Sequence, residues 1–106
     1  MSRYSLKMFE KIVRELERLV MSLVLELKKI EKIFEDVRSL LRQATMTGDE
    51  SIKQLALSAE KLMKLALDSL RRGDESSARF YLSELKRLLR VLSETMEVYR
   101  ELGWIR

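Results

Sequence analysis

The sequence predicts an all-helical (all-α) protein, and three observations support that fold class. Apolar side chains recur at alternating spacings of three and four over the first forty-odd residues, which is the heptad pattern of a helix packing along a seam. The chain contains no Pro and only three Gly. Two segments of identical sequence, Gly-Asp-Glu-Ser at residues 48–51 and 73–76, divide the rest of the chain into further helical patterns.

The first predicted helix covers about residues 3–46. No Gly, Pro or Asn interrupts its seam, so we expect it to be continuous. At a rise of 1.5 Å per residue it is roughly 66 Å long. The seam positions are Leu6, Phe9, Val13, Leu16, Val20, Leu23, Leu27, Ile30, Phe34, Val37, Leu41 and Ala44.

Two further amphipathic helices are predicted, over about residues 49–72 and 74–102. In each Gly-Asp-Glu-Ser segment the glycine is suited to end one helix and the aspartate to cap the next. Such short connections require antiparallel neighbours. The sequence therefore predicts an up-down-up three-helix bundle that forms a single domain over residues 1–106.

The repeated turn between regular amphipathic helices resembles the practice of de novo designed helical bundles. A second, local resemblance covers residues 62–91, around the segment Gly73-Asp74-Glu75-Ser76-Ser77-Ala78-Arg79-Phe80-Tyr81. This segment is similar to the helical hairpin of archaeal ESCRT-type filament subunits, although the long preceding helix does not match them. Both resemblances imply helices joined by a tight turn at this place.

The predicted helix lengths do not match, because the second and third helices span only roughly 36 Å and 43 Å. The turn at Gly48 fixes one end of the first helix beside its partners, so the excess falls at about residues 3–20. An uncovered apolar stripe there would be unusual for a monomer, which favours self-association, most simply as a homodimer. The predicted self-contact residues are Leu6, Phe9, Ile12, Val13, Leu16 and Leu19.

An alternative removes the need for this interface. If the first helix breaks near Met21-Ser22, its first half folds back and the protein becomes a four-helix bundle. Ser22 is a weak helix breaker and no turn residues stand beside it, so the continuous helix is the preferred prediction.

A second apolar line is predicted on the outer side of the last helix, where a partner helix could lie. The alternative is that the helices of the bundle simply have wide apolar faces. The candidate partner face consists of Phe80, Val91, Val98, Leu102 and Trp104.

A basic stripe is predicted on the outer side of the first helix, in a chain with a net charge of +4. Such a stripe could bind nucleic acid without sequence preference, or an anionic bilayer surface. The alternative is a solvated face with Glu10, Glu15 and Glu17 beside it. The stripe residues are Lys7, Lys11, Arg14, Arg18, Lys28, Lys29 and Lys32.

Enzymatic function is disfavoured because the chain contains no His and no Cys, the most common acid-base group and nucleophile. We expect no catalytic residue, cofactor or metal site. No secretory signal or transmembrane segment is expected, which favours a cytoplasmic location, or recombinant origin for a designed protein. Abundant Arg, Lys and Glu are typical of thermostable proteins and of idealised helices. The sequence thus predicts a non-enzymatic interaction or scaffold module.

Overall fold

The computed structural model describes residues 3–103, and the side chains of residues 7–103. Within this range the chain forms four helices: α1 (Arg3–Met21), α2 (Leu27–Thr45), α3 (Glu50–Arg71) and α4 (Glu75–Glu101). No strand occurs in that part of the chain. The predicted all-helical class is therefore confirmed.

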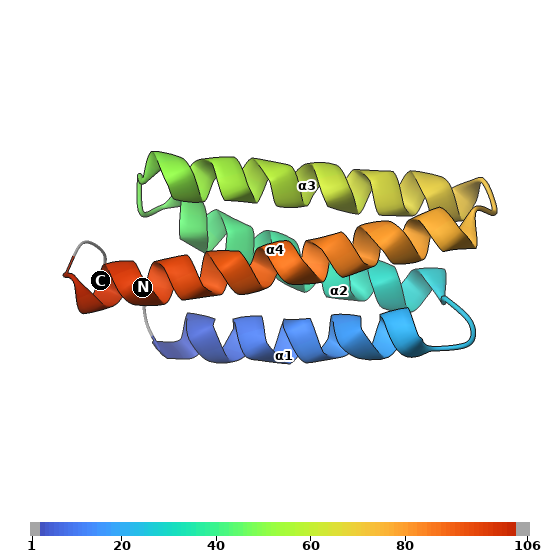
Figure 1. The fold of residues 1–106 in the computed structure, drawn as a ribbon, viewed down its shortest axis with the longest axis horizontal. Helices are drawn as coiled ribbons and strands as arrows, with labels where there is room; N and C mark the ends of the chain where they lie inside the picture. Colours follow the sequence, from blue (N-terminus) through green and yellow to red (C-terminus); the bar gives the residue numbers. More distant parts are fainter. Residues whose placement is uncertain (1–2, 104–106) are drawn as a thin grey trace.

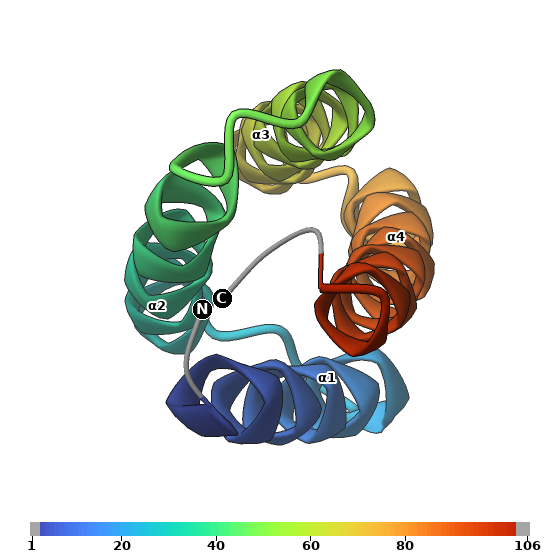
Figure 2. The same cartoon turned by 90° about the vertical axis from the view of Figure 1, so that its left-hand side faces the viewer.

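The four helices run antiparallel to their neighbours and surround one core (Figure 1). Seen from the end, they follow one another around this core in chain order, so that α1 lies between α2 and α4 (Figure 2). The molecule is elongated, with extents of 45 × 22 × 18 Å. The turn between α1 and α2 and the turn between α3 and α4 lie together at one end of the long axis (Figure 1).

The core contains one buried stripe from each helix, as the apolar periodicity requires. In α3 the stripe is largely of small side chains, including Ala56, Ala59 and Ala66, whereas α4 contributes four fully buried leucines. Small residues facing large ones let two helices approach closely. The residues of α4 that are buried completely are Leu82, Leu85, Leu89 and Leu92.

The two Gly-Asp-Glu-Ser turns form as predicted. Gly48 and Gly73 take the left-handed conformation, with φ of 76° and 80°. Asp49 accepts a hydrogen bond from the backbone N–H of Ile52 at 3.1 Å, and Asp74 accepts one from that of Ser77 at 3.1 Å. These are the helix stop and helix start expected from the sequence.

The prediction of one continuous helix over residues 3–46 is wrong. The helix ends at Met21, an irregular segment covers residues 22–26, and α2 begins at Leu27. The break falls where the four-helix alternative places it. Because α1 folds back along α2, its apolar stripe is covered by the rest of the same chain, and the overhang predicted for residues 3–20 does not form.

The predicted self-contact residues are accordingly part of the core. Phe9 and Leu16 are completely buried, and the exposed fractions of Ile12, Val13 and Leu19 are 7% or less. The side chain of Leu6 lies outside the described residues. Other helices of the same chain pack on this stripe, so its side chains are not available on the surface.

Candidate functional site

The turn between α1 and α2, with the two helix ends beside it, has four exposed large apolar side chains at the end of the molecule. The exposed fractions are 82% for Met21, 96% for Leu23, 68% for Val24 and 38% for Leu27. Leu25, in the middle of the same turn, points inward and is buried. We call the four exposed residues the apolar tip. Exposed apolar clusters of this kind are uncommon on monomers and are typical of interaction sites.

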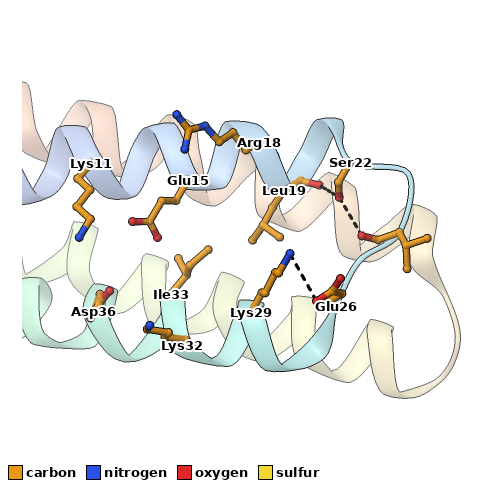
Figure 3. A pocket seen from close by; sticks show the side chains of 11 residues that line it. Lys11, Glu15, Arg18, Leu19, Ser22, Glu26, Lys29, Lys32, Ile33 and Asp36 are labelled. Carbon is orange, nitrogen blue, oxygen red and sulfur yellow. Dashed lines mark hydrogen bonds and ion pairs between the residues drawn. The ribbon is translucent and has the colours of Figure 1, made fainter.

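Side chains of the turn and of α4 hold this segment in place. The hydroxyl of Ser22 donates to the carbonyl oxygens of Leu19 at 2.7 Å and Val24 at 3.0 Å, as Figure 3 shows. A serine that bonds to the preceding turn offers the backbone an alternative to the helix. This local bond alone is weak, because Ser22 is the only turn-forming residue in the segment.

A pair of charged residues on α4 supplies the stronger restraint. The guanidinium of Arg79 donates to the carbonyl oxygens of Val20 at 2.8 Å and Leu23 at 3.1 Å. Glu75 accepts from the backbone N–H of Leu25 at 3.2 Å and pairs with Arg79 at 3.1 Å. We call Glu75 and Arg79 the clasp. It occupies carbonyl groups that a continuing helix would need, and therefore ends α1.

Basic side chains surround the apolar tip. Arg18 belongs to the last turn of α1, Lys28 and Lys29 belong to the first turn of α2, and all three are exposed. Arg71 and Arg72, also exposed, lie on the neighbouring turn at the same end. Two nearby carboxylates are already in ion pairs, Glu26 with Lys29 at 3.6 Å and Asp68 with Arg71 at 3.9 Å. The end of the molecule thus combines apolar and cationic groups.

Next to the tip, a groove of about 610 Å³ runs between α1 and α2. Its lining includes the apolar side chains of Leu19 and Ile33 (Figure 3), together with Val24 of the tip. In Figure 3 the side chain of Glu15 points across it toward α2, and Lys29 points back toward α1. The groove is lined by Lys11, Glu15, Arg18, Leu19, Ser22, Val24, Glu26, Lys29, Lys32, Ile33 and Asp36.

The predicted basic stripe is therefore not a straight line along one helix. The break in the first helix places Lys11 and Arg18 of α1 across the groove from Lys29 and Lys32 of α2, with three carboxylates among them. Arg14 lines a different groove, between α1 and α4. Lys7 and Lys28 are exposed but line neither groove. The seven cations therefore do not form one continuous stripe in this fold, and binding of a polyanion by them stays a prediction.

The predicted partner face is exposed on α4. The exposed fractions are 59% for Phe80, 44% for Val91, 50% for Val98 and 57% for Leu102. Thr95 lies between the valines in sequence, and its hydroxyl donates to the carbonyl oxygen of Val91 at 2.8 Å. Phe80 is separated from this row by the ion pair of Glu84 with Arg87. Trp104 lies outside the described residues.

The described residues contain no group of three or more His, Cys, Asp or Glu side chains that could hold a metal ion. The pKa of Asp74 lies below its ordinary value. The hydrogen bonds it accepts from the Ser77 hydroxyl and backbone N–H lower the pKa, with a smaller contribution from Arg72. This shift belongs to the helix cap and indicates no acid-base chemistry.

Comparison of the chain with protein-family models, with curated proteins and with solved structures finds no match. None of the four helices in the described part of the chain combines the length and apolar character needed to cross a membrane. The fold and its surfaces define the class as an all-helical protein with an exposed apolar tip bordered by cations.

The sequence predictions missed the apolar tip and the clasp. Leu23 and Leu27 were placed on the buried seam of a continuous helix, and Arg79 was given no role. One signal was present, since the run Met21-Ser-Leu-Val-Leu is more apolar than a single helix face requires.

Proposed function

We propose that the protein is a non-enzymatic helical binding module that docks onto an anionic membrane surface through its apolar tip. The observation that carries this proposal is the exposure of Met21, Leu23 and Val24, by 68% or more each, at the end of an elongated molecule. Because the tip lies at the end of the long axis, it can enter a lipid surface while the helices remain in water (Figure 1).

The charges around the tip support a membrane with acidic lipids over a neutral one. Each Lys or Arg close to an anionic bilayer contributes about 1 kcal/mol of binding free energy. Lys28 makes no ion pair among the described residues, so its charge is available to lipid headgroups. The charge of Arg72 is partly offset by Asp74, whose pKa it helps to lower.

Apolar insertion and charge are both needed. Complete burial of a large apolar side chain is worth about 1.5–3 kcal/mol, and a shallow insertion recovers only part of this. One hydrophobic anchor alone typically gives marginal membrane binding, and stable attachment takes a second signal such as a basic patch. We therefore expect weak binding to neutral vesicles and clearly stronger binding to anionic ones.

Vesicle flotation tests the proposal, with phosphatidylcholine vesicles compared with vesicles that also contain phosphatidylserine. The variant Leu23→Gln with Val24→Gln should lose most of the binding, because both side chains are exposed and their replacement leaves the core intact. The matched control is Leu57→Gln with Val98→Gln, two exposed apolar residues outside the tip, which should bind normally. Equal binding by the tip variant and the control would contradict the proposal.

A charge variant separates lipid from nucleic acid. Arg18→Gln with Lys28→Gln should weaken binding to phosphatidylserine vesicles and reduce its dependence on salt. If the protein instead retains duplex DNA at low salt, and this retention depends on Lys11 and Arg14 but not on Leu23, the membrane proposal is wrong. The basic residues would then serve nucleic acid.

A second candidate function is binding of a partner helix along α4. Val91, Val98 and Leu102 face outward on one side, and the last turns of α4 extend past the ends of α1 and α3 (Figure 1). A partner helix with apolar residues at spacings of three and four fits such a row. Peptides of this pattern, selected from a library on the unmodified protein, should fail to bind Val91→Lys with Val98→Lys.

A further inference from the structure

The break between α1 and α2 is not dictated by the residues that form it. Residues 21–27 contain no Gly, Pro or Asn, and no residue other than glycine in the described chain has a positive φ. Glu26 occupies the N-cap position of α2, yet its side chain makes no capping hydrogen bond. The local sequence therefore favours a helix over a turn.

The apolar pattern also continues through the break. Val20, Leu23 and Leu27 hold the spacing of three and four that joins the seam of α1 to the seam of α2. In the folded chain Leu23 is 96% exposed and Leu27 is 38% exposed, so these seam positions are uncovered. A continuous helix would return them to one line with buried residues on both sides.

The clasp is the restraint that opposes a continuous helix. Arg79 bonds to the carbonyls of Val20 and Leu23, and Glu75 bonds to the N–H of Leu25. In a helix across residues 20–27 the carbonyls of Val20 and Leu23 would accept from the N–H groups four residues later, and the N–H of Leu25 would donate to the carbonyl four residues earlier. The clasp would then have no free acceptors and no free donor there. Two arrangements of this segment thus compete for the same hydrogen-bonding groups.

We propose that two copies of this chain exchange α1 when the clasp opens. Residues 3–45 then form one helix, and α1 of each copy takes the place between α2 and α4 that it occupies within a single chain. The exchanged α1 keeps the contacts of Phe9, Ile12 and Leu16 with the core, because the same sequence surrounds it in the partner. Exchange of an identical element is a low-cost route to a dimer.

The geometry favours a second copy of this chain as the partner that packs on Leu23 and Leu27. Around a two-fold axis at the hinge, the two long helices lie antiparallel, and Leu23 and Leu27 of one copy meet the same residues of the other. In the exchanged dimer, Leu23 and Leu27 of each copy are therefore buried against the same two residues of the other copy. The ion pair between Glu17 and Arg90, which joins α1 to α4, would become a contact between chains.

This inference goes beyond the membrane proposal and does not rest on it. The exchanged dimer hides Leu23 and Leu27, so membrane docking and exchange use the same residues in different states. The two proposals are tested separately, because exchange is measured by the mass of the particle in buffer without lipid.

Light scattering after size-exclusion chromatography tests the exchange, following refolding at high protein concentration. Arg79→Met removes the donors to both carbonyls and keeps an aliphatic side chain. We expect it to raise the dimer-to-monomer ratio by at least about tenfold over the unmodified protein, the size expected for losing hydrogen bonds from a charged group. A purely monomeric Arg79→Met protein with normal helical circular dichroism would overturn the proposal.

A second substitution shows whether the dimer needs a helical hinge. Val24→Pro is incompatible with a continuous helix, because proline lacks the N–H and clashes with the preceding turn. The backbone N–H of Val24 makes none of the hydrogen bonds found in the turn, so the folded monomer should tolerate it. Arg79→Met with Val24→Pro should therefore return to the monomer, and a persistent dimer would contradict the exchange.

Cross-linking identifies which copy supplies α1. The chain has no native Cys, so Glu17→Cys with Arg90→Cys provides the only two thiols. A bifunctional maleimide should join these thiols within one chain in the monomer fraction, and between two chains in the dimer fraction of the Arg79→Met protein. A dimer that is cross-linked only within each chain would show association through another surface and would overturn the exchange.

Discussion

The turns of this molecule are made in two different ways. The turns after α2 and α3 are specified by their own residues. Gly48 and Gly73 take the left-handed conformation, and Asp49 and Asp74 are the caps. The turn at residues 22–26 has neither device, and α4 holds it through the clasp. Both kinds reverse the chain, but only the first kind would persist in a short isolated peptide.

The difference has a consequence for function. The turn after α2 exposes a single large apolar side chain, Met46, with an exposed fraction of 85%, because Gly, Asp and Glu occupy the positions that follow. A turn held from outside can consist of Met21, Leu23 and Val24 and display them at the end of the molecule. The surface that we assign to membrane docking and to exchange exists because the restraint lies on a different helix.

The largest expected change in the free energy of unfolding comes from weakening the packing of α1 against the core, because the turn at residues 22–26 depends on that packing. Leu16 is completely buried, so Leu16→Ala should lower the free energy of unfolding by about 2–5 kcal/mol. Urea denaturation measures this loss. Amide hydrogen exchange should show that α1 and the following turn lose protection before the α3–α4 hairpin does.

The control for this prediction is Leu57→Ala, because Leu57 is 62% exposed on α3. It should change the free energy of unfolding by no more than about 0.5 kcal/mol. A similarly small effect of Leu16→Ala would mean that α1 does not pack in the core, and the comparison between the turns would then lose its basis.

A smaller effect is expected at a turn that contains its own stop signal. Gly73 has φ of +80°, and no atom lies within 4 Å of the position that a Cβ would take. Gly73→Ala should therefore cost only the backbone strain of the left-handed conformation, about 1–2 kcal/mol by urea denaturation. Gly73→Asn should cost less, because asparagine tolerates this conformation, and equal losses would contradict the explanation by strain.

The sequence predicted the parts of the fold that depend on neighbouring residues. The helical class and the two Gly-Asp turns follow from periodicity and capping, which act within a few residues. The break at residues 22–26 could not be predicted in this way. Arg79 is more than fifty residues distant from the carbonyls it binds, and nothing near Ser22 specifies that contact.

The positions of the predicted site residues depend on the same break. The basic stripe and the self-contact stripe were both predicted on one straight helix. Because α1 folds back, the basic stripe is divided between two helices and the self-contact stripe is buried. The outer row on α4 depends on one regular helix, and its exposed positions Val91, Val98 and Leu102 were correctly placed. Homodimer formation and a role of that row in partner binding stay predictions.

The N-cap of α2, at the end of the turn at residues 22–26, lacks a side-chain hydrogen bond that a substitution can supply. Glu26 has the extended backbone of an N-cap residue, with φ of −96° and ψ of 119°, but makes no side-chain cap. The shorter carboxylate of Glu26→Asp is suited to accept from the first turn of α2, which should raise the free energy of unfolding by about 0.5–1 kcal/mol. Loss of the exposed pair with Lys29 offsets only a small part of this.

The measurement is the urea midpoint of Glu26→Asp compared with that of Glu26→Ala, which lacks an acceptor and should show no gain. The same variant sharpens the exchange proposal, because a capped α2 favours the turn over the continuous helix. An unchanged midpoint would indicate that the clasp already fixes the turn so completely that a local cap adds nothing.

The smallest expected effect is a pH dependence at a turn that contains its own cap. The pKa of Asp74 is lowered below its ordinary value of 3.8, first by the Ser77 hydroxyl and then by the Ser77 backbone N–H. A lowered pKa in the folded state means that the charged cap stabilises the fold above that ordinary value. The contribution is lost as the pH falls through the lower pKa of the folded state.

Asp74→Asn isolates this contribution, because asparagine keeps a neutral acceptor at the cap and cannot become charged. The difference in urea midpoint between the unmodified protein and Asp74→Asn should shrink as the pH falls from about 5 to about 2.5. Ser77→Ala removes the main cause of the shift, so in that background the pH dependence of the difference should be weaker. A difference that stays constant over this range would show that the cap acts through its shape and not through its charge.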